Sequence, residues 1–247
     1  MSPRRAPVEE RDFSPARRPP QFDRNEQMEL TNIMKEIIFQ ERETESAKIE
    51  LSLKSDFNIL DAFRMIDFRN IGAFTPSDMI EYLDRHLGFT EFSTDDIFLF
   101  FKKVDKTGRQ KINLSEFSNA YLPFSREYSS LVSDRPDYYS SRGADFSRFF
   151  NTDTRRDMKA VWTMIFKAER AMEAIRYRLS KRIYYNSRQA HDFCARNQAG
   201  IVTSHDLREL LSEMGFYSTD REIQGLLNRL DRDRDGVISI VDWMDEF

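Results

Sequence analysis

The twelve residues 231–242 constrain this chain more than any other stretch. They read DRDRDGVISIVD, with acidic side chains at positions 1, 3, 5 and 12, a glycine at position 6 and an apolar residue at position 8. A hard divalent cation needs several oxygen ligands from one short segment, and the glycine permits the sharp turn between them. We therefore expect a metal site formed by Asp231, Asp233, Asp235, the backbone carbonyl of Val237, Ser239 directly or through a water, and Asp242.

Apolar residues at helical spacing flank this loop on both sides. Those before it are Ile223, Leu226, Leu227 and Leu230, and those after it are Trp243 and Phe247. A loop of this composition between two helices resembles the calcium-binding loop of the EF-hand, calmodulin-like superfamily. The resemblance implies a calcium site, and the alternative is an acidic surface loop that binds no ion.

The last ligand position departs from the pattern of that superfamily. Position 12 is Asp242, where a glutamate is usual. The shorter side chain favours one oxygen over two and hence six-fold coordination, which narrows the preference for calcium over magnesium. We expect one site of modest affinity that takes Ca²⁺ or, in its place, Mg²⁺.

Three further segments keep the frame of such a loop but lack ligands. Residues 67–78 keep the glycine and the apolar residue but carry Arg69 and Ile71 at positions 3 and 5. Residues 105–116 carry Arg109 and Gln110 at positions 5 and 6, although Asp105, Thr107 and Glu116 remain. Residues 195–206 keep Gly200 and Val202 and have alanine at positions 1 and 5. We expect these three loops to fold without binding calcium.

Paired loops of this kind meet through short strands at position 8. This rule predicts that Phe74 pairs with Ile112 and that Val202 pairs with Ile238. The predicted fold is all-α, with two EF-hand pairs, each preceded by a long amphipathic helix, and short bridging strands between paired loops. The predicted units are an arm at 1–25, a first helix and pair at 26–121, a connector at 122–152, and a second helix and pair at 153–247.

The two halves repeat beyond their loops. At a constant offset of 128 residues the chain matches Leu30 with Met158, Met34 with Trp162, Ile37 with Ile165, Ile38 with Phe166 and Glu41 with Glu169. The repeating unit is a leading helix followed by an EF-hand pair. Each leading helix could fill the groove of the pair that follows it, and the alternatives are that these helices face an outside partner or each other.

Arginine and aromatic residues concentrate outside the loops. Residues 1–25 are rich in proline and arginine, which predicts a disordered arm that is either solvated or laid along an acidic surface. The helix expected at residues 154–186 has ten basic residues by its end and three acidic ones, which makes it a candidate site for an acidic partner. The connector carries Tyr138, Tyr139, Phe146, Phe149 and Phe150, so we expect it to dock on this protein or on a partner.

Composition limits the classes of function. No apolar run approaches the length of a membrane span, and the start lacks a secretory signal, so we expect a cytoplasmic protein that does not contact a membrane. Cys194 is the only cysteine, and we expect it to be a buried apolar thiol. No catalytic pairing of residues and no recognised nucleic-acid module is present, so we expect neither an enzyme nor a nucleic-acid partner.

Two functions remain after these exclusions. The first is a calcium-sensing regulator of the calmodulin or centrin type, and the second is a structural protein whose EF-hand pairs serve as binding modules. The loss of ligands from three loops favours the second.

The order of elements also resembles that of EF-hand proteins of ciliary and flagellar axonemes. A leading helix, an EF-hand pair and then a segment such as PFSREYSSL, at residues 123–131, repeat along the chain. Those proteins include microtubule inner proteins of the doublet lumen. The resemblance implies the cytoskeleton of the cilium as the location, with tubulin and neighbouring axonemal proteins as partners.

Overall fold

The computed structural model describes residues 22–136, 149–182, 185–196 and 199–247. Almost all of the predicted arm lies outside these ranges, as do Tyr138, Tyr139 and Phe146 of the connector. The described part is helical apart from one short antiparallel sheet and one isolated bridge, so the all-α prediction is confirmed. None of its helices combines the length and apolar character needed to cross a membrane.

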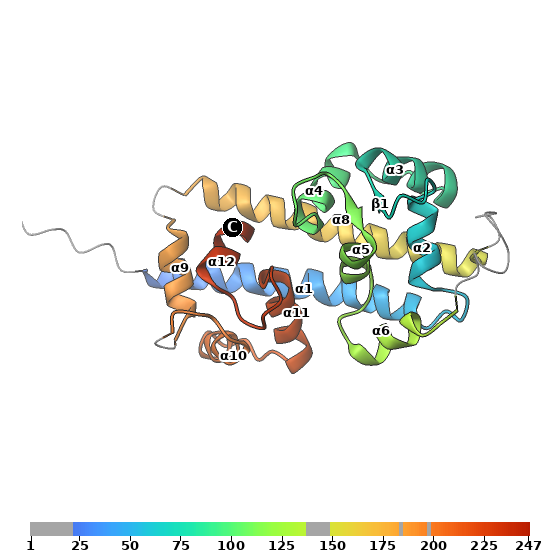
Figure 1. The fold of residues 1–247 in the computed structure, drawn as a ribbon. Coiled ribbons are helices and arrows are strands. Elements are labelled where there is room, and N and C mark those ends of the chain that lie inside the picture. Colours follow the sequence, from blue (N-terminus) through green and yellow to red (C-terminus); the bar gives the residue numbers. More distant parts are fainter. Residues whose placement is uncertain (1–21, 137–148, 183–184, 197–198) are drawn as a thin grey trace, which may run out of the picture.

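The helices and strands follow the chain in a repeated order (Figure 1). In the first half they are α1 (Arg24–Ser52), α2 (Ile59–Ile66), β1 (Ala73–Phe74), α3 (Pro76–Glu81), the π-helix η1 (Tyr82–Leu87), α4 (Thr94–Val104), β2 (Ile112–Asn113), α5 (Leu114–Tyr121) and α6 (Arg126–Ser133). In the second half they are α8 (Thr152–Ser180), α9 (Ser187–Cys194), α10 (Ser204–Glu213), α11 (Asp220–Leu230) and α12 (Ile240–Glu246).

The two long helices, α1 and α8, lie side by side in opposite directions along the whole molecule (Figure 1). Asp23 and Glu26 form a capping box that starts α1, and the Asn151 side chain accepts the Thr154 N–H at the start of α8. The antiparallel order is set by contacts along their length: Arg182 pairs with Glu29, Thr44 Oγ1 donates to the Met164 carbonyl at 3.5 Å, and Lys54 pairs with Asp157 at 3.0 Å. Helix α8 ends at Ser180, earlier than the end near residue 186 that the sequence predicts.

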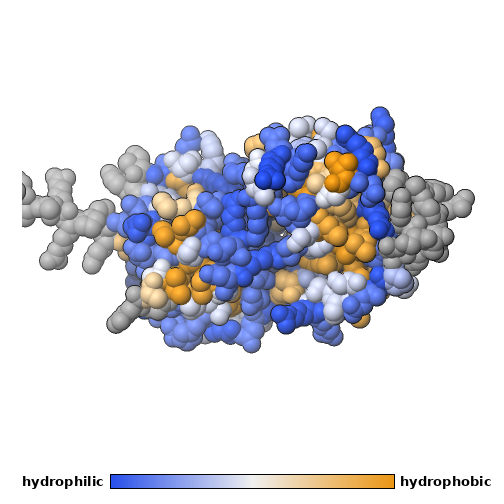
Figure 2. Space-filling model, viewed as in Figure 1, coloured by the Kyte–Doolittle hydropathy of each residue, from blue (hydrophilic) through white to orange (hydrophobic). Residues whose placement is uncertain are grey.

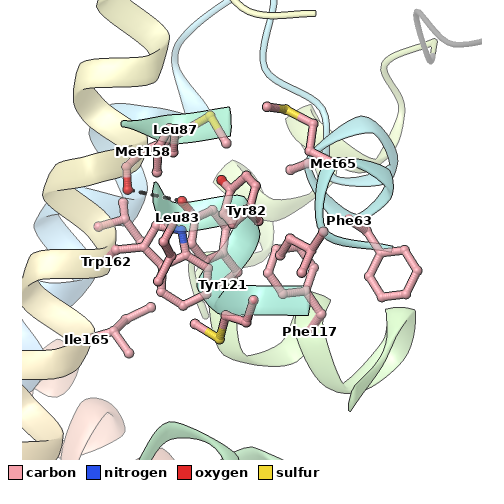
Figure 3. Packing of buried hydrophobic residues seen from close by; sticks show 14 of the residues in the cluster. Phe63, Met65, Tyr82, Leu83, Leu87, Phe117, Tyr121, Met158, Trp162 and Ile165 are labelled. Carbon is pink, nitrogen blue, oxygen red and sulfur yellow. Dashed lines mark hydrogen bonds between the residues drawn. The ribbon is translucent and has the colours of Figure 1, made fainter. Parts of the chain in front are cut away.

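The amino-terminal half of α8 fills the groove of the first EF-hand pair (Figure 3). Trp162 is fully buried there, and its ring lies 5.2 Å from that of Phe100 on α4 and 4.8 Å from that of Tyr121 on α5, measured between centroids. The Tyr121 hydroxyl donates to the carbonyl of Met158 at 3.2 Å, so the buried polar end of that ring is satisfied. The remaining α8 residues of this core are Met158, Val161, Ile165 and Phe166.

The amino-terminal half of α1 occupies the matching place in the second pair. It packs against α11, where Met34 is fully buried at the position that Trp162 holds in the repeat. The α1 residues of this core are Leu30, Ile33, Met34, Ile37 and Ile38, and α8 adds Met172, Ile175 and Leu179 from its carboxyl-terminal half. The repeat positions predicted from the sequence are therefore equivalent in three dimensions.

The hypothesis that each leading helix fills the groove of its own pair is wrong. Of the buried residues in the first core, α1 contributes only Leu51 among those that the structure describes, and α8 provides the anchor. The helices do face each other, as one alternative held, and each then extends into the pair of the opposite half. Because they run antiparallel, the amino-terminal half of each reaches the far pair.

The segment between the halves docks on the protein itself at its described ends. Phe149 and Phe150 are buried in the first core, in agreement with one of the two alternatives for the connector. The segment is also less irregular than expected, because residues 126–133 form α6. The Arg135 guanidinium donates to the carbonyls of Ser52 and Phe57, both at 2.8 Å, and so binds the carboxyl-terminal end of α1, where the helix dipole favours a cation.

A buried cluster of charges joins the two halves near the middle of α1 and α8. Arg229 of α11 donates two hydrogen bonds to Glu169 and a third, at 2.9 Å, to Glu246. Glu41, the repeat equivalent of Glu169, lies 3.6 Å from the same guanidinium. Lys103 of α4 crosses the seam to Glu246 at 2.9 Å and to the Arg229 carbonyl at 2.7 Å. Figure 2 shows the surface counterpart, a hydrophilic band between two hydrophobic patches.

The lone cysteine has the surroundings expected from the sequence. Cys194 ends α9, is fully buried and is a free thiol. Burial raises the pKa of this thiol well above its usual range. The residue therefore packs as a small apolar group, since the reactive thiolate is disfavoured.

We predict that truncation of each anchor weakens the pair of the opposite half. Trp162→Ala should cost about 3–5 kcal/mol of unfolding free energy, because it removes a fully buried ring. Hydrogen exchange should then accelerate mainly in residues 59–121, whereas Met34→Ala should accelerate it mainly in residues 187–247. Tyr177→Ala, on the exposed face of α8, is the control and should change neither region. If both core variants accelerated hydrogen exchange in the same region, each long helix would not anchor the opposite half.

The charge cluster predicts a specific dependence of stability on pH. Burial alone would raise the pKa of Glu246, but the cations Arg229, Lys103 and Arg176 outweigh it and lower the pKa to about 2. A carboxyl group with a lowered pKa stabilises the fold above its unfolded value near 4.5, and this contribution is lost as the pH falls toward 2. Glu246→Gln should therefore cost about 3 kcal/mol at pH 7 and progressively less below pH 4.5.

Urea unfolding of both proteins at pH 7, 4.5 and 3 measures this difference. Glu81→Gln, which removes an exposed partner of Arg85, is the control and should change stability by less than ~0.5 kcal/mol at every pH. A Glu246→Gln deficit that stays constant down to pH 3 would rule out the lowered pKa as its origin.

Candidate metal centre

The loop at residues 231–242 is held between α11 and α12 in a conformation suited to a cation. Gly236 has φ of 91° and Arg234 has φ of 64°, so the backbone turns sharply at positions 6 and 4 of the loop. Ile238 at position 8 pairs with Val202 of the neighbouring loop through two backbone hydrogen bonds, of 3.0 and 2.9 Å. The predicted pairing of these two loops is confirmed, and it fixes the loop against α9 and α10.

Three of the six predicted ligands converge. Single carboxylate oxygens of Asp231, Asp233 and Asp235 all lie within 4.8 Å of one another. Asp231 is buried and accepts the Arg234 N–H at 2.6 Å and the Gly236 N–H at 2.8 Å, whereas the other two side chains are exposed. Burial raises the pKa of Asp231, and the nearby Asp235 raises it further. A bound cation would relieve this repulsion.

The other three predicted ligands are arranged differently. Asp242 is buried, but its carboxylate completes a capping box with Ser239 at the start of α12, and it also accepts the Arg232 N–H at 3.2 Å. Ser239 Oγ donates to Asp242 at 2.6 Å and so points along the helix cap. The Val237 N–H donates to Asp235 at 3.0 Å. Asp242 therefore lies outside the cluster of three aspartates.

The donor set fits a hard divalent cation. Three carboxylates from one turn supply the oxygens that calcium and magnesium prefer, and Asp242 is held at the edge of the loop by hydrogen bonds that an ion would replace. Asp231, Asp233 and Asp235 would hold the ion, with Asp242 completing the site from α12. The structure brings together the three acidic side chains at positions 1, 3 and 5, and the metal site itself stays a prediction.

The first loop carries its own cation. Arg69, at position 3, pairs through its guanidinium with the position 12 carboxylate of Asp78, which is buried. Asp67, at position 1, accepts the backbone N–H groups of Ile71 and Gly72 at 3.0 and 2.7 Å. Sequence reasoning excluded a metal here because of Arg69, but it missed that this arginine takes the place of the ion.

The second loop is held by hydrogen bonds from its own backbone to its carboxylates. Asp105 accepts the N–H of Thr107 at 2.9 Å and that of Gln110 at 2.6 Å, and Glu116 accepts the Asn113 N–H at 3.0 Å. Gln110 has φ of 54° where glycine is usual, so the loop keeps its turn at a cost of about 1 kcal/mol in backbone strain. Its strand pairs Ile112 with Phe74, as predicted.

The third loop, at residues 195–206, is described except for residues 197 and 198. Gly200 has φ of 65°, in agreement with the turn at position 6 of the other three loops. Asp206, at position 12, caps α10 through Thr203, whose hydroxyl donates to it at 2.7 Å. All four loops therefore share a backbone turn, while acidic groups cluster for a metal only in the fourth among the described residues.

The basic face of α8 is largely occupied within the chain. Arg170 forms two hydrogen bonds of 2.5 Å with Asp96 of α4, and this contact lowers the pKa of the aspartate against the effect of burial. Further cations on α8 are also paired: Arg176 with Glu246, Arg178 with Glu36, and Lys159 with the Gly88 carbonyl. Arg182, just after the helix, pairs with Glu29. Much of the excess charge read from the sequence thus holds α8 in place.

Comparison with known proteins agrees with this geometry. A sequence profile described as an EF-hand domain pair matches residues 56–122. These residues form an EF-hand pair, and such pairs are calcium-binding modules. The match covers the two loops that lack metal ligands. The similarity therefore comes from the helices and the apolar and turn positions of these loops. Among curated proteins, none matches the chain.

Because the first loop keeps the backbone turn of the fourth, we predict that a metal site can be restored in it. Arg69→Asp with Ile71→Asp would give residues 67–78 aspartates at positions 1, 3, 5 and 12 with Gly72 at position 6, the acidic pattern of the fourth loop. Calorimetric titration with calcium should then show one more site per chain than the unmodified protein. Ile71→Asp alone is the control, because Arg69 still occupies the cage. An unchanged stoichiometry in the double variant would show that the first loop has lost more than its ligands.

Proposed function

We propose that this protein is a non-enzymatic structural protein that uses its EF-hand pairs as rigid binding modules, with one Ca²⁺ or Mg²⁺ site at residues 231–242. The observation that carries this proposal is that each groove is already filled by a helix of the same chain. The residues expected to hold the ion are Asp231, Asp233, Asp235 and Asp242, with the Val237 carbonyl and Ser239 at the remaining positions.

A filled groove is unsuited to a switch. Sensors of the calmodulin type expose an apolar groove on binding calcium and then take up a target helix. In this protein a target would have to displace Trp162 and its four companions from the first pair, and losing one such buried ring costs about 3–5 kcal/mol. No ion is expected in either loop of that pair, so calcium has no direct means to open it.

The alternative function, a calcium-sensing regulator that binds target helices, is best supported in the second pair. That pair contains the cluster of three aspartates, and α1 enters its groove with aliphatic residues and Met34 instead of an aromatic anchor. If calcium opens any groove in this protein, it is this one. The two functions therefore differ in what the second pair does when the ion binds.

The absence of catalysis is also part of the proposal. His191 is buried against Trp243, with its Nε2 atom 3.1 Å from the Ile238 carbonyl, and therefore serves the packing of the second pair. His205 is exposed beside Glu209 on α10. Neither histidine forms a constellation with a nucleophile among the contacts described above.

We predict one metal site and little structural opening. Calorimetric titration with calcium, and separately with magnesium, should give a single site, and Asp233→Asn with Asp235→Asn should abolish it. An apolar dye should gain little fluorescence when calcium is added. Asp192→Asn with Asp245→Asn, two acidic changes outside the three-aspartate cluster, is the control. Several tight sites, or a large gain in dye binding with calcium, would favour the sensor.

We further propose the ciliary axoneme as the setting, with tubulin and neighbouring axonemal proteins as partners. The support is the repeated order of leading helix, EF-hand pair and connector, together with the arginine-rich arm. A tagged copy should localise to the axoneme and remain there after salt extraction. Loss of the protein on mild salt washing, or a location elsewhere in the cytoplasm, would contradict this setting while leaving the metal site and the filled grooves unaffected.

A further inference from the structure

The seam between the two halves contains a cavity of about 800 Å³. It is lined by residues of α1 and α8 and by residues of the second loop of the first pair and of the fourth loop. The hydrophilic band of Figure 2 runs across this part of the molecule, and the surface is hollowed there. Both halves therefore contribute walls to one polar cavity.

Cationic side chains outnumber acidic ones in its lining. The cationic residues are Lys48, Lys103, Lys106, Arg126, Arg229, Arg232 and Arg234, and the acidic residues are Glu41, Glu45, Glu116, Glu169 and Asp231. Several of the acids are already satisfied by neighbours. Glu169 accepts two hydrogen bonds from Arg229, Glu45 accepts the Phe124 and Ser125 N–H groups, and Glu116 accepts that of Asn113.

Four of the cations lack a carboxylate partner. Lys48, Lys106, Arg126 and Arg234 form no ion pair within 4.0 Å among the described residues. Lys106 donates to the Arg232 carbonyl at 2.7 Å and Arg234 to the Asn119 carbonyl at 3.0 Å, both of them uncharged acceptors. These two hydrogen bonds cross the seam in opposite directions. The carboxylate that acts on Arg234 is that of Asp231, which also lines the cavity.

Two of these cations, Lys48 and Arg234, are close enough to act on each other. The contact of Glu45 with the Ser125 N–H brings the start of α6, and hence Arg126, to the part of α1 that carries Lys48. Burial lowers the pKa of Lys48, and Arg234 lowers it further by repulsion, whereas Glu41 and Glu45 raise it. The cavity thus brings Lys48 of the first half and Arg234 of the second half to one space, beside the acidic Glu41 and Glu45.

We propose that this seam cavity binds a small molecule carrying two or more phosphate groups, held by Lys48, Lys106, Arg126 and Arg234. A guanidinium presents a planar fork that matches phosphate oxygens, and an ammonium group supplies a point charge. A compound with several phosphates can reach cations on both walls, which a single phosphate cannot do across a cavity of this size. Because the cations come from both halves, the bound anion connects them.

Calorimetric titration with sodium pyrophosphate tests this proposal. The buffer is freed of divalent ions, so that pyrophosphate cannot act by removing a metal from the fourth loop, whose Asp231 and Arg234 also line the cavity. The full chain should form a one-to-one complex. Lys48→Gln with Arg126→Gln should weaken it by at least tenfold, since charge-assisted contacts to phosphate contribute about 1.5–3 kcal/mol each.

Arg109→Gln with Lys111→Gln is the matched control. Both residues are exposed in the same loop as Lys106 and neither lines the cavity, so the affinity should change less than twofold. Circular dichroism checks that the variants fold, and Lys106→Gln alone replaces the double variant if that one does not. No complex, or equal weakening by both double variants, would overturn the proposal. Tighter binding of a glutamate-rich peptide than of pyrophosphate would also overturn it.

Discussion

The antiparallel crossing of α1 and α8 determines the rest of this structure. At its centre the equivalent residues Glu41 and Glu169 face the same guanidinium, that of Arg229, and Lys103 and Glu246 complete the cluster across the seam. The buried carboxylate of Glu169 and the partly buried one of Glu41 would repel each other and lose hydration, so this helix packing depends on these cations. Once this packing is fixed, each helix projects its amino-terminal half onto the shorter helices of the opposite half, and neither half has a complete core without the other.

The parts of this fold that follow from local pattern could be predicted. The four loops, the pairing of Phe74 with Ile112 and of Val202 with Ile238, and the repeat positions of Met34 and Trp162 are all in place. Periodicity identifies which face of a helix is apolar, but it does not say which groove receives that face. The exchange of helices depends on the relative direction of two helices more than one hundred residues apart, and no local signal in the chain encodes that direction.

The charged residues were harder to interpret than the apolar ones. The basic excess of α8 looked like a surface for a partner, yet Arg170, Arg176 and Arg178 hold the helix to α4, α12 and α1. The sequence shows Arg69 only as the loss of a ligand, whereas its pairing with Asp78 compensates that carboxylate inside the first loop. The sequence does not show which distant residue a charged side chain will pair with. The three aspartates of the fourth loop can be grouped from the sequence because they lie in one short segment.

The exchange of helices has a consequence for the order of synthesis. As the chain leaves the ribosome, the first EF-hand pair is finished well before residues 158–166 of α8 emerge, so its groove faces solvent with Phe100, Phe117 and Tyr121 uncovered. The apolar face of the amino-terminal half of α1 stays uncovered still longer, because the core that buries it is completed by the last helix of the chain. A nascent chain of this kind is prone to aggregate during translation. A chaperone that binds apolar surface would act on it before the two halves pack together.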